Sequence, residues 1–342
     1  MKKHFRWLAV LLAIVLVTAA CGSDDDGDEG ASDSSSESSD SSSDSASEAV
    51  EQTQGGDLTF HMITHSDDGP FWSVVNRGMD AACADLGVTC VWVPGNNDAN
   101  VMVQGIEGAI GEGTDGIAAS LPDPAALVPA LQAAVDAGIP VVTLNSGAND
   151  YQSIGALTHV GQTEFIAGQA AGNRFNDAGV SHVLCGQQEQ NNIGLTERCA
   201  GLEDTFSGTV TTDFMDLDAD TAAQQAAINA AMAADDSIDG FLGVGPVITM
   251  SGVRAAADLG RDVVVGGFDL TPELLGAIEG GDVLFTVDQQ QYLQGYLPIL
   301  TMYLNQTNAN VIGGGLPILT GPGFVTADNA ADVLALSEAG TR

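Results

Sequence analysis

From about residue 57 to its end, the chain alternates short apolar runs with longer, alanine-rich stretches. The expected strands are Leu58–Thr64, Thr89–Val93, Gly116–Ser120, Pro140–Leu144, Leu157–Val160, Ser181–Cys185, Thr209–Phe214, Gly240–Gly243, Val263–Gly267 and Val283–Val287. The expected helices include Phe71–Leu86, Asn97–Gly111, Ala125–Ala137, Glu164–Phe175, Thr221–Ala234 and Val247–Leu259. Strands that are apolar on both faces and separated by helices predict parallel sheet in an α/β fold.

Helix ends support this pattern. Gly87, Gly138 and Gly260 each follow a helical stretch at the position where a left-handed cap is favoured. Ten strands are many for one sheet in a chain of this length. We therefore expect two parallel sheets of about five strands each, and hence two lobes.

The N-terminus carries a targeting signal. A basic head, which contains Lys2, Lys3 and Arg6, precedes an apolar run from Leu8 to Val17. This run has the length of a signal-peptide core and is shorter than the ~20 residues of a spanning helix. We therefore expect residues 1–20 to be a signal peptide.

The segment Val17–Cys21 resembles the cleavage site of bacterial lipoprotein precursors, although Thr18 stands where that family usually has Leu. The resemblance implies cleavage before Cys21 and attachment of lipid to its thiol. The protein would then lie outside the cytoplasm, in the periplasm or on the cell surface, anchored to the membrane through this lipid. The alternative is an ordinary secretory signal followed by an unrelated cysteine.

Residues 21–56 are expected to form a disordered acidic tether. Between Gly22 and Asp57 the chain has no basic residue, few large apolar residues and many serines and aspartates, so it cannot bury enough surface to fold. The net charge of the whole chain is −37. After the signal, the strong bases are Arg77, Arg174, Arg198, Arg254, Arg261 and Arg342. This charge argues against nucleic acid or anionic lipid as a partner.

Four cysteines follow Cys21, and they form two pairs that are close in sequence. In an oxidising compartment we expect the bridges Cys83–Cys90 and Cys185–Cys199, each closing a short connection between a helix and a strand. The alternative is four free buried thiols. The histidines are scattered and no Cys-x-x-Cys is present, so no metal site is expected.

Enzyme motifs are weak in this sequence. The segment 111–116 matches G-x-G-x-x-G, but it follows a helix and precedes a strand, the reverse of a dinucleotide site. The segment 243–246 follows a strand but lacks the lysine of a P-loop, and no G-x-S-x-G occurs. We therefore expect neither an enzyme nor a cofactor.

Polar and aromatic residues gather at the carboxyl ends of the expected strands, where open α/β sheets bind ligands. They are Ser66, Asp68, Phe71 and Trp72 after the first strand, Ser120 and Asn145 after the third and fourth, and Asp269 and Gln289 after the last two.

Over residues 57–342 the chain resembles the type I periplasmic sugar-binding proteins, the ribose-binding-like receptors of ABC importers. The residues that carry the resemblance are Gly69–Trp72 with Gly78, Ala137–Asn145, His159–Gln162 with Gly168, Glu197 and Arg198 with Gly201, Val265–Pro272, and Thr286–Gln289 with Gly295. The resemblance implies two doubly wound lobes that close on a sugar through a hinge, and a membrane permease that receives it from a monomeric receptor.

The resemblance also implies where the lobes meet. The crossovers fall near Gly161–Gln162, Gln289–Gln290 and Leu319–Gly323. The N-terminal lobe would comprise 57–161 plus 290–320, and the C-terminal lobe 162–289 plus 321–342.

The candidate side chains suit a sugar. Phe71 and Trp72 offer apolar faces to its C–H groups, and the polar candidates Ser120, Asn145, Arg198, Asp269 and Gln289 offer hydrogen bonds to its hydroxyls. We also name Asn191 as a ligand contact, with its neighbour Asn192 as the alternative. Three further alternatives stay open: an ion pair of Arg198 with Glu197 or Glu203, a helix cap at Asp269, and a helix start at Gln289.

Two departures bear on the ligand. Asn145–Ser146 stands where ribose-type members carry Asp-Arg, and Gly245–Pro246 stands where they carry Asn or Asp. Losing an Asp and an Arg removes two charge-assisted hydrogen bonds of about 1.5–3 kcal/mol each. We therefore expect a neutral monosaccharide other than ribose, or an alditol. The alternative function is a receptor that presents a sugar-like signal to a membrane sensor.

Overall fold

The computed structural model describes residues 55–67, 69–216 and 220–342. The predicted signal peptide, the lipid site at Cys21, the tether up to residue 54 and the candidate Asp68 lie outside these described residues.

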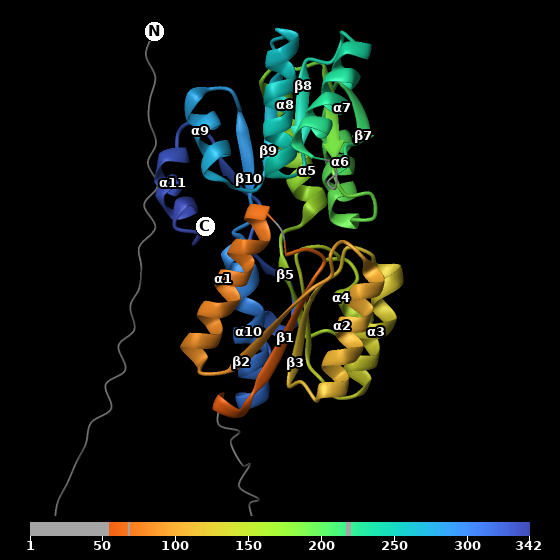
Figure 1. The fold of residues 1–342 in the computed structure, drawn as a ribbon, viewed down its shortest axis with the longest axis vertical. Coiled ribbons are helices and arrows are strands. Elements are labelled where there is room, and N and C mark those ends of the chain that lie inside the picture. Colours follow the sequence, from red (N-terminus) through yellow and green to blue (C-terminus); the bar gives the residue numbers. More distant parts are fainter. Residues whose placement is uncertain (1–54, 68, 217–219) are drawn as a thin grey trace, which may run out of the picture. The chain divides into compact units, whose positions relative to one another are not determined.

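The structure contains two sheets, one in each of two lobes (Figure 1). The first has six strands in the order β11-β5-β4-β3-β1-β2, all parallel. The strands are β1 (Thr59–Thr64), β2 (Thr89–Pro94), β3 (Gly116–Ser120), β4 (Val141–Leu144), β5 (Thr158–Gly161) and β11 (Ile318–Leu319). Strand β1 lies between β3 and β2 and is buried on both faces. Phe60 and Met62 pack toward one layer of helices and Ile63 toward the other, which explains why apolar residues occupy both faces of this strand.

The second sheet repeats this order as β12-β10-β9-β8-β6-β7. Its strands are β6 (His182–Gln187), β7 (Thr209–Phe214), β8 (Gly240–Gly243), β9 (Val264–Phe268), β10 (Phe285–Asp288) and β12 (Gly323–Val325). Only β12 runs antiparallel to its neighbour in this sheet. The two sheets therefore share one winding.

Helices cover both faces of each sheet. The helices around the first sheet are α1 (Gly69–Leu86), α2 (Ala99–Glu112), α3 (Pro124–Asp136), α4 (Tyr151–Ile154) and α10 (Gln291–Asn308), with short 3-10 turns at Gly55–Asp57 and Ile312–Gly315. Those around the second are α5 (Glu164–Asp177), α6 (Ile193–Thr205), α7 (Thr221–Ala234), α8 (Pro246–Leu259), α9 (Pro272–Gly280) and α11 (Ala330–Glu338). Four separate apolar clusters fill the four sheet faces, so each lobe has its own two-sided core.

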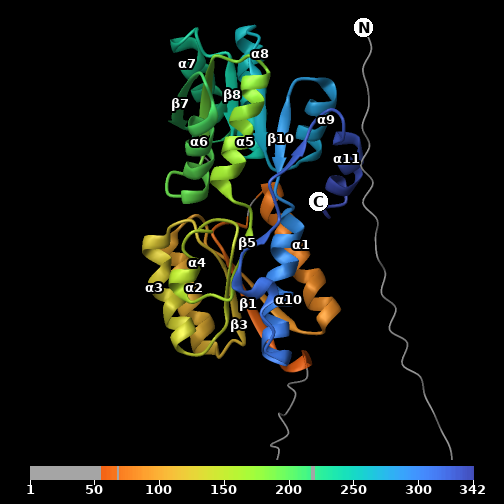
Figure 2. The same ribbon diagram turned by 180° about the vertical axis from the view of Figure 1, so that it is seen from behind.

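The chain passes between the sheets three times. It does so between β5 and α5, between β10 and α10, and between β11 and β12 (Figure 2). Each crossing segment is short, since β5 ends at Gly161 and α5 begins at Glu164, and β10 ends at Asp288 and α10 begins at Gln291. Short paired connections of this kind let two packed lobes rotate about a hinge.

Two helix pairs pack with their backbones in close contact. A Cβ on Gly78 of α1 would lie 2.1 Å from the carbonyl oxygen of Tyr292 in α10, and one on Gly295 would lie 1.9 Å from that of Val75. The second lobe repeats the device between α5 and α6. There a Cβ on Gly168 of α5 would lie 2.1 Å from the backbone carbonyl oxygen of Arg198 in α6. Both α1 and α6 follow the first strand of their sheet, and both carry candidate site residues.

The fold class expected from the sequence is confirmed, and all ten expected strands are present. The structure adds β11 and β12, which are too short to give a periodic signal. Both expected cysteine pairs, Cys83–Cys90 and Cys185–Cys199, are disulfide-bonded. Within the described ranges, no helix has both the length and the apolar character needed to cross a membrane.

Candidate functional site

A cavity of about 650 Å³, including the part open to solvent, lies between the two lobes. The first lobe and the hinge line it with His65, Ser66, Gly69, Pro70, Phe71, Trp72, Asn145 and Gln289. The second lobe lines it with Gln188, Glu189, Asn192, Leu195, Arg198, Gly245, Pro246, Val247, Ile248 and Asp269. The cavity is therefore built from the loops at the carboxyl ends of both sheets.

One wall is aromatic. Phe71 and Trp72 begin α1, and their rings meet edge to face with centroids 5.0 Å apart. The Trp72 ring also meets the His65 ring, at 4.7 Å. Both aromatic side chains keep at most a tenth of their surface exposed, so packing fixes their positions while both line the cavity. This wall offers an apolar face to a ligand.

His65 is held from below by Ser120. The Ser120 hydroxyl lies 2.9 Å from both the backbone nitrogen and Nδ1 of His65. Ser120 itself is fully buried at the end of β3 and does not line the cavity. The structure therefore gives this predicted contact a supporting position, in which it holds the His65 ring that lines the cavity.

The lobes touch each other through polar side chains at the cavity. The Asn192 amide nitrogen, from the second lobe, lies 3.4 Å from His65 Nε2 and donates to Glu189 at 2.7 Å. The Ser146 hydroxyl, from the first lobe, donates to Asn192 Oδ1 at 2.9 Å. Burial lowers the pKa of His65. The charge of nearby Glu189 opposes this downward shift, and the charge of Arg198 adds to it. A neutral His65 ring fits these contacts, because its Nε2 can then accept a hydrogen bond from Asn192.

Arg198 forms a buried ion pair with Glu164. Its Nε and one terminal nitrogen donate to the two Glu164 carboxylate oxygens at 2.6 and 3.0 Å, and the other terminal nitrogen donates to the Val244 carbonyl at 2.8 Å. Its guanidinium also lies over the Phe268 ring at 4.5 Å. Burial works to lower the pKa of Arg198, but Glu164 outweighs it and the net shift is upward.

These contacts use three of the five N–H donors of Arg198, counted over the described residues. The remaining two, one on each terminal nitrogen, are free for a ligand in the cavity that Arg198 lines. The alternative weighed for Arg198, an ion pair with Glu197 or Glu203, is absent from the described part of the chain. The guanidinium pairs instead with Glu164, which lies 34 residues away in the sequence. Arg198 is thus a buried structural charge that also lines the cavity.

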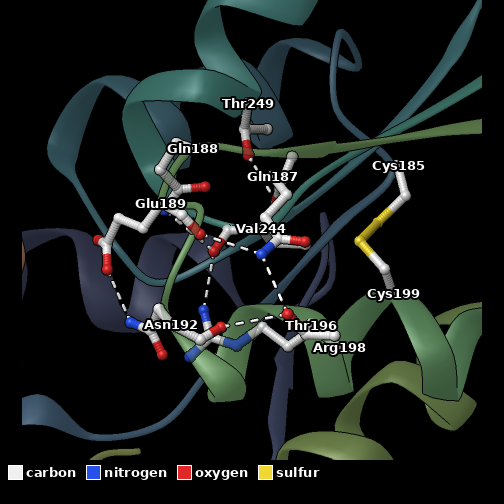
Figure 3. The surroundings of a disulfide bond; sticks show 11 residues. Cys185, Gln187, Gln188, Glu189, Asn192, Thr196, Arg198, Cys199, Val244 and Thr249 are labelled. Carbon is white, nitrogen blue, oxygen red and sulfur yellow. Dashed lines mark hydrogen bonds between the residues drawn. A yellow bond between two sulfur atoms is a disulfide. The ribbon is translucent and has the colours of Figure 1, made fainter. Parts of the chain in front are cut away.

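A disulfide braces the segment that carries these residues (Figure 3). The bridge joins Cys185 in β6 to Cys199 in α6, directly after Arg198. Inside this loop, the Gln187 amide donates to the Glu189 carbonyl at 3.0 Å and to the Thr196 hydroxyl at 3.1 Å. The loop that forms much of the second lobe's wall is therefore closed covalently at its base and cross-linked by hydrogen bonds.

Asp269 and Gln289 form the hinge side of the cavity. The Gln289 amide donates to Asp269 Oδ1 at 2.6 Å, and Gln294 donates to Gln289 Oε1 at 2.8 Å. Asp269 has a left-handed backbone at φ 67°, a conformation that is uncommon outside glycine and frequent at functional sites. Burial raises the pKa of Asp269 to about 6, although Arg198 and Gln289 oppose the shift. The carboxylate is therefore ionised at neutral pH and can accept hydrogen bonds from hydroxyls.

Asn145 completes the polar set. It also has a left-handed backbone, at φ 62°, and its amide nitrogen lies 3.3 Å from Gln294 Oε1. Its Oδ1 lies 3.0 Å from the Ser146 hydroxyl oxygen. The amide is thereby oriented at the boundary between the first lobe and the hinge.

The structure brings seven of the ten ligand-contact candidates to the cavity lining: Ser66, Phe71, Trp72, Asn145, Arg198, Asp269 and Gln289. Asn191 lies outside it, in a neighbouring cavity, and Asn192 takes the inner position. The reason is local: Asn192 caps α6 by accepting from the Gly194 nitrogen at 3.0 Å, so its side chain turns inward at the start of the helix.

Sequence reasoning missed His65, Gln188, Glu189 and the apolar residues at the start of α8. The first three directly follow β1 and β6, so the rule that ligands bind beyond strand ends could have found them. In the described ranges, no group of three or more His, Cys, Asp or Glu side chains is placed to hold a metal ion.

The sequence is similar to a known protein family and to two characterised sugar-binding proteins. A family model described as a periplasmic binding protein domain matches residues 60–308. The xylose/arabinose-binding protein XylF of Sulfolobus acidocaldarius is 29% identical over 293 residues, which cover 80% of this chain and 72% of that protein. The ribose import binding protein RbsB of Bacillus subtilis is 22% identical over 263 residues, which cover 70% of this chain and 79% of its own.

Solved structures agree. A carbohydrate transporter from Acidothermus cellulolyticus, solved in complex with myo-inositol, is 38% identical with a TM-score of 0.81, and the match covers 83% of this chain and 99% of that one. A solute-binding protein of an ABC transporter from Burkholderia graminis, solved with D-arabinose, has a TM-score of 0.72 at 23% identity, covering 80% and 97% of the two chains. At 23% identity, the similarity to the Burkholderia graminis protein shows a shared fold only.

Proposed function

Because the chain belongs to the periplasmic binding protein family, as a sugar-binding receptor of the ABC-importer type and not an enzyme, we propose that it captures a neutral sugar or cyclic polyol between its lobes. In this proposal the receptor is a monomer, and its closed form delivers the ligand to a membrane permease. The observation that carries the proposal is the pairing of an aromatic wall, Phe71 and Trp72, with the hydrogen-bonding groups of Arg198, Asp269 and Gln289 around one cavity.

The chemistry of the cavity supports a neutral polyhydroxylated ligand. Arg198 supplies two free N–H donors, Asp269 supplies carboxylate oxygens, and Asn145 and Gln289 supply amides that can donate and accept. A polyol presents both donors and acceptors around one ring, so it can use all of these groups at once. An anionic ligand would meet the carboxylates of Glu189 and Asp269 in the same space.

Two kinds of ligand are favoured within this class. The myo-inositol bound by the 38% identical structure and the xylose or arabinose named for the 29% identical relative are both small, neutral and rich in hydroxyls. Ribose is disfavoured because Asn145 and Ser146 replace a charged pair, which leaves fewer charge-assisted hydrogen bonds. We therefore place a cyclic polyol such as myo-inositol first and an aldopentose second.

The test is a thermal-shift screen of the purified protein followed by calorimetric titration of each hit. The panel holds myo-inositol, D-xylose, D- and L-arabinose, D-ribose, D-glucose and open-chain alditols, with amino acids and nucleosides as controls. A ligand at 100 times its Kd should stabilise the protein by about 2.7 kcal/mol. A shift with a nucleoside or amino acid and with none of the polyols would overturn the proposal.

The proposal also includes the anchor. We propose that cleavage before Cys21 and lipidation of its thiol tether the two lobes, 57–161 plus 290–320 and 162–289 plus 321–342, to the outer side of the membrane. Its support is the basic head, apolar run and small residues that precede Cys21. Wild-type protein should partition into the detergent phase of a Triton X-114 extract, and a Cys21→Ser variant should not. Equal partitioning of the two would contradict the anchor.

A further inference from the structure

A second cavity, of about 900 Å³ including its open part, lies beside the first. The two share four lining residues, His65, Gln188, Glu189 and Asn192. Like the first, the outer cavity is lined from both lobes. One side comes from the loops that follow β2 and β3, and the other from the loops that follow β6 and β7. The shared side chains therefore lie where the first, or inner, cavity adjoins the second, or outer, cavity in the same cleft.

The outer cavity contains an exposed aromatic ring. Phe214 ends the edge strand β7 and keeps 42% of its surface exposed at the cavity wall. An aromatic face left open to water beside polar groups is the usual partner of the C–H face of a sugar ring, because stacking removes apolar surface from water.

Amide side chains surround this ring. Asn97, Gln190 and Asn191 line the outer cavity, and none of their side chains has a hydrogen-bond partner in the described part of the chain. Asn97 also has a left-handed backbone, at φ 57°, and its nitrogen donates to the His65 carbonyl at 2.6 Å. The loop is thus held against His65, and the Asn97 amide lines the outer cavity with its donors and acceptor available.

The charge of the outer cavity limits what it can hold. Among the described residues, its lining includes the carboxylates of Asp123, Glu189 and Asp216 and contains no lysine or arginine. A phosphate or a uronic acid would meet like charges with no cation to offset them. A neutral ring with hydroxyl groups meets the available amides, carboxylates and the Phe214 face without that penalty.

We propose that the outer cavity is a second carbohydrate subsite, so that the chain binds a neutral two-ring ligand, either a disaccharide or a glycoside of a cyclic polyol. The inner ring occupies the cavity between Trp72 and Arg198, and the outer ring stacks on Phe214 within reach of Asn97 and Asn191. This inference rests on the proposed function, since it assigns a second unit to the ligand of the same cleft.

The experiment compares matched one-ring and two-ring ligands by calorimetric titration of the purified protein. The pairs are D-xylose with β-1,4-xylobiose, L-arabinose with α-1,5-arabinobiose, and myo-inositol with its α-galactoside. For at least one pair we expect the two-ring ligand to bind about tenfold more tightly, which corresponds to about 1.4 kcal/mol.

Two exposed phenylalanines provide a matched pair of variants. Phe214→Ala should return the affinity for the two-ring ligand to that of the single ring and leave single-ring binding unchanged. Phe165→Ala removes an aromatic side chain of similar exposure, 37%, that lines neither cavity, and it should change neither affinity. Asn191→Ala should weaken only the two-ring ligand, by a smaller factor.

The outcomes separate the two proposals. If single-ring ligands bind and no two-ring ligand binds more tightly than its single-ring partner, the outer subsite is overturned. The proposed function then stays in place. A two-ring advantage that survives Phe214→Ala and Asn191→Ala also overturns the subsite. If no polyol of either size binds, both proposals fail.

Discussion

The two lobes have the same sheet order and the same close helix pairs, yet they bring different chemistry to the cleft. In the first lobe, the helix after the first strand is α1, which presents Phe71 and Trp72. In the second, the corresponding helix is α6, which presents Arg198 next to a disulfide. The same architecture therefore supplies the cavity with an apolar wall from the first lobe and a charged, hydrogen-bonding wall from the second.

The two disulfides show the same contrast. Cys83–Cys90 joins the last turn of α1 to the start of β2, at the end of the sheet away from the cleft. Cys185–Cys199 closes the segment that contains Glu189, Asn192 and Arg198. We infer that the first bridge supports the lobe alone, whereas the second also positions ligand-facing groups.

The largest expected effect comes from the buried charge of the second lobe. Arg198→Ala leaves Glu164 buried without its partner, so we expect it to lower the free energy of unfolding by about 3–5 kcal/mol and to abolish binding. Adding Glu164→Gln removes the unpaired charge and should restore most of the stability without restoring binding. Urea unfolding and calorimetry measure the two effects. Binding by the double variant would contradict a ligand-facing role for Arg198.

Removing each disulfide should separate stability from affinity. The double variants Cys83→Ala/Cys90→Ala and Cys185→Ala/Cys199→Ala should each lose about 2–4 kcal/mol of unfolding free energy. Only the second should also weaken ligand binding, because it frees the α6 segment that carries Arg198. Equal loss of affinity in both variants, measured well below their melting temperatures, would remove the contrast between the lobes.

The glycine contacts provide a smaller test of the shared architecture. Gly78→Ala in α1 and Gly201→Ala in α6 each place a Cβ about 2 Å from a backbone oxygen of the neighbouring helix, and each should destabilise the protein by about 1–3 kcal/mol. Gly276→Ala in α9, whose new Cβ would meet nothing within 4 Å, is the control and should be neutral or slightly stabilising. Thermal melts of the three variants compare them directly, and a Gly201→Ala protein as stable as the control would contradict the close α5–α6 contact.

The smallest effect expected is on the pH dependence. The folded pKa of Asp269, about 6, lies above its usual value near 3.8, so between these values the folded protein binds a proton that the unfolded chain does not. Asp269 should therefore make the ligand-free protein more stable as the pH falls from 7 to 5, by on the order of 1 kcal/mol. Ligand affinity should fall over the same range, because the protonated carboxyl loses an acceptor.

His65 has the opposite sign, since its pKa is lowered and its contribution to stability is lost as the pH falls. The measurement is therefore the difference between wild type and Asp269→Asn, in which the contribution of His65 cancels. A difference that does not change between pH 7 and pH 5 would contradict the raised pKa of Asp269.

Much of the fold was predictable because it depends on local patterns. Strands buried on both faces and helices that end at Gly87 or Gly138 leave clear signals in the sequence. The site was predictable where it follows strand ends, as at Asp269 and Asn145. The site was not predictable where the exact start of a helix decides which of two neighbouring side chains lines the cavity, as at Asn191 and Asn192.

Partnerships between distant residues were the least predictable. Glu164 and Arg198 lie on different helices, and only the glycine-mediated contact of α5 with α6 brings them together. Ser120 sits one strand away from His65 and supports it from beneath the cavity, a role that no feature of its own sequence neighbourhood indicates.

The central claim is that the two lobes bind one neutral polyol jointly, the first through its aromatic wall and the second through Arg198 and Asp269. Calorimetric titration of the purified protein with myo-inositol, in parallel with Asp269→Asn and Phe71→Ala, tests this claim most directly. We predict saturable one-to-one binding by the wild type that either substitution weakens at least about tenfold, or by about 1.4 kcal/mol. The claim would be contradicted if neither myo-inositol nor any pentose bound the wild type, or if they bound both variants as tightly as the wild type.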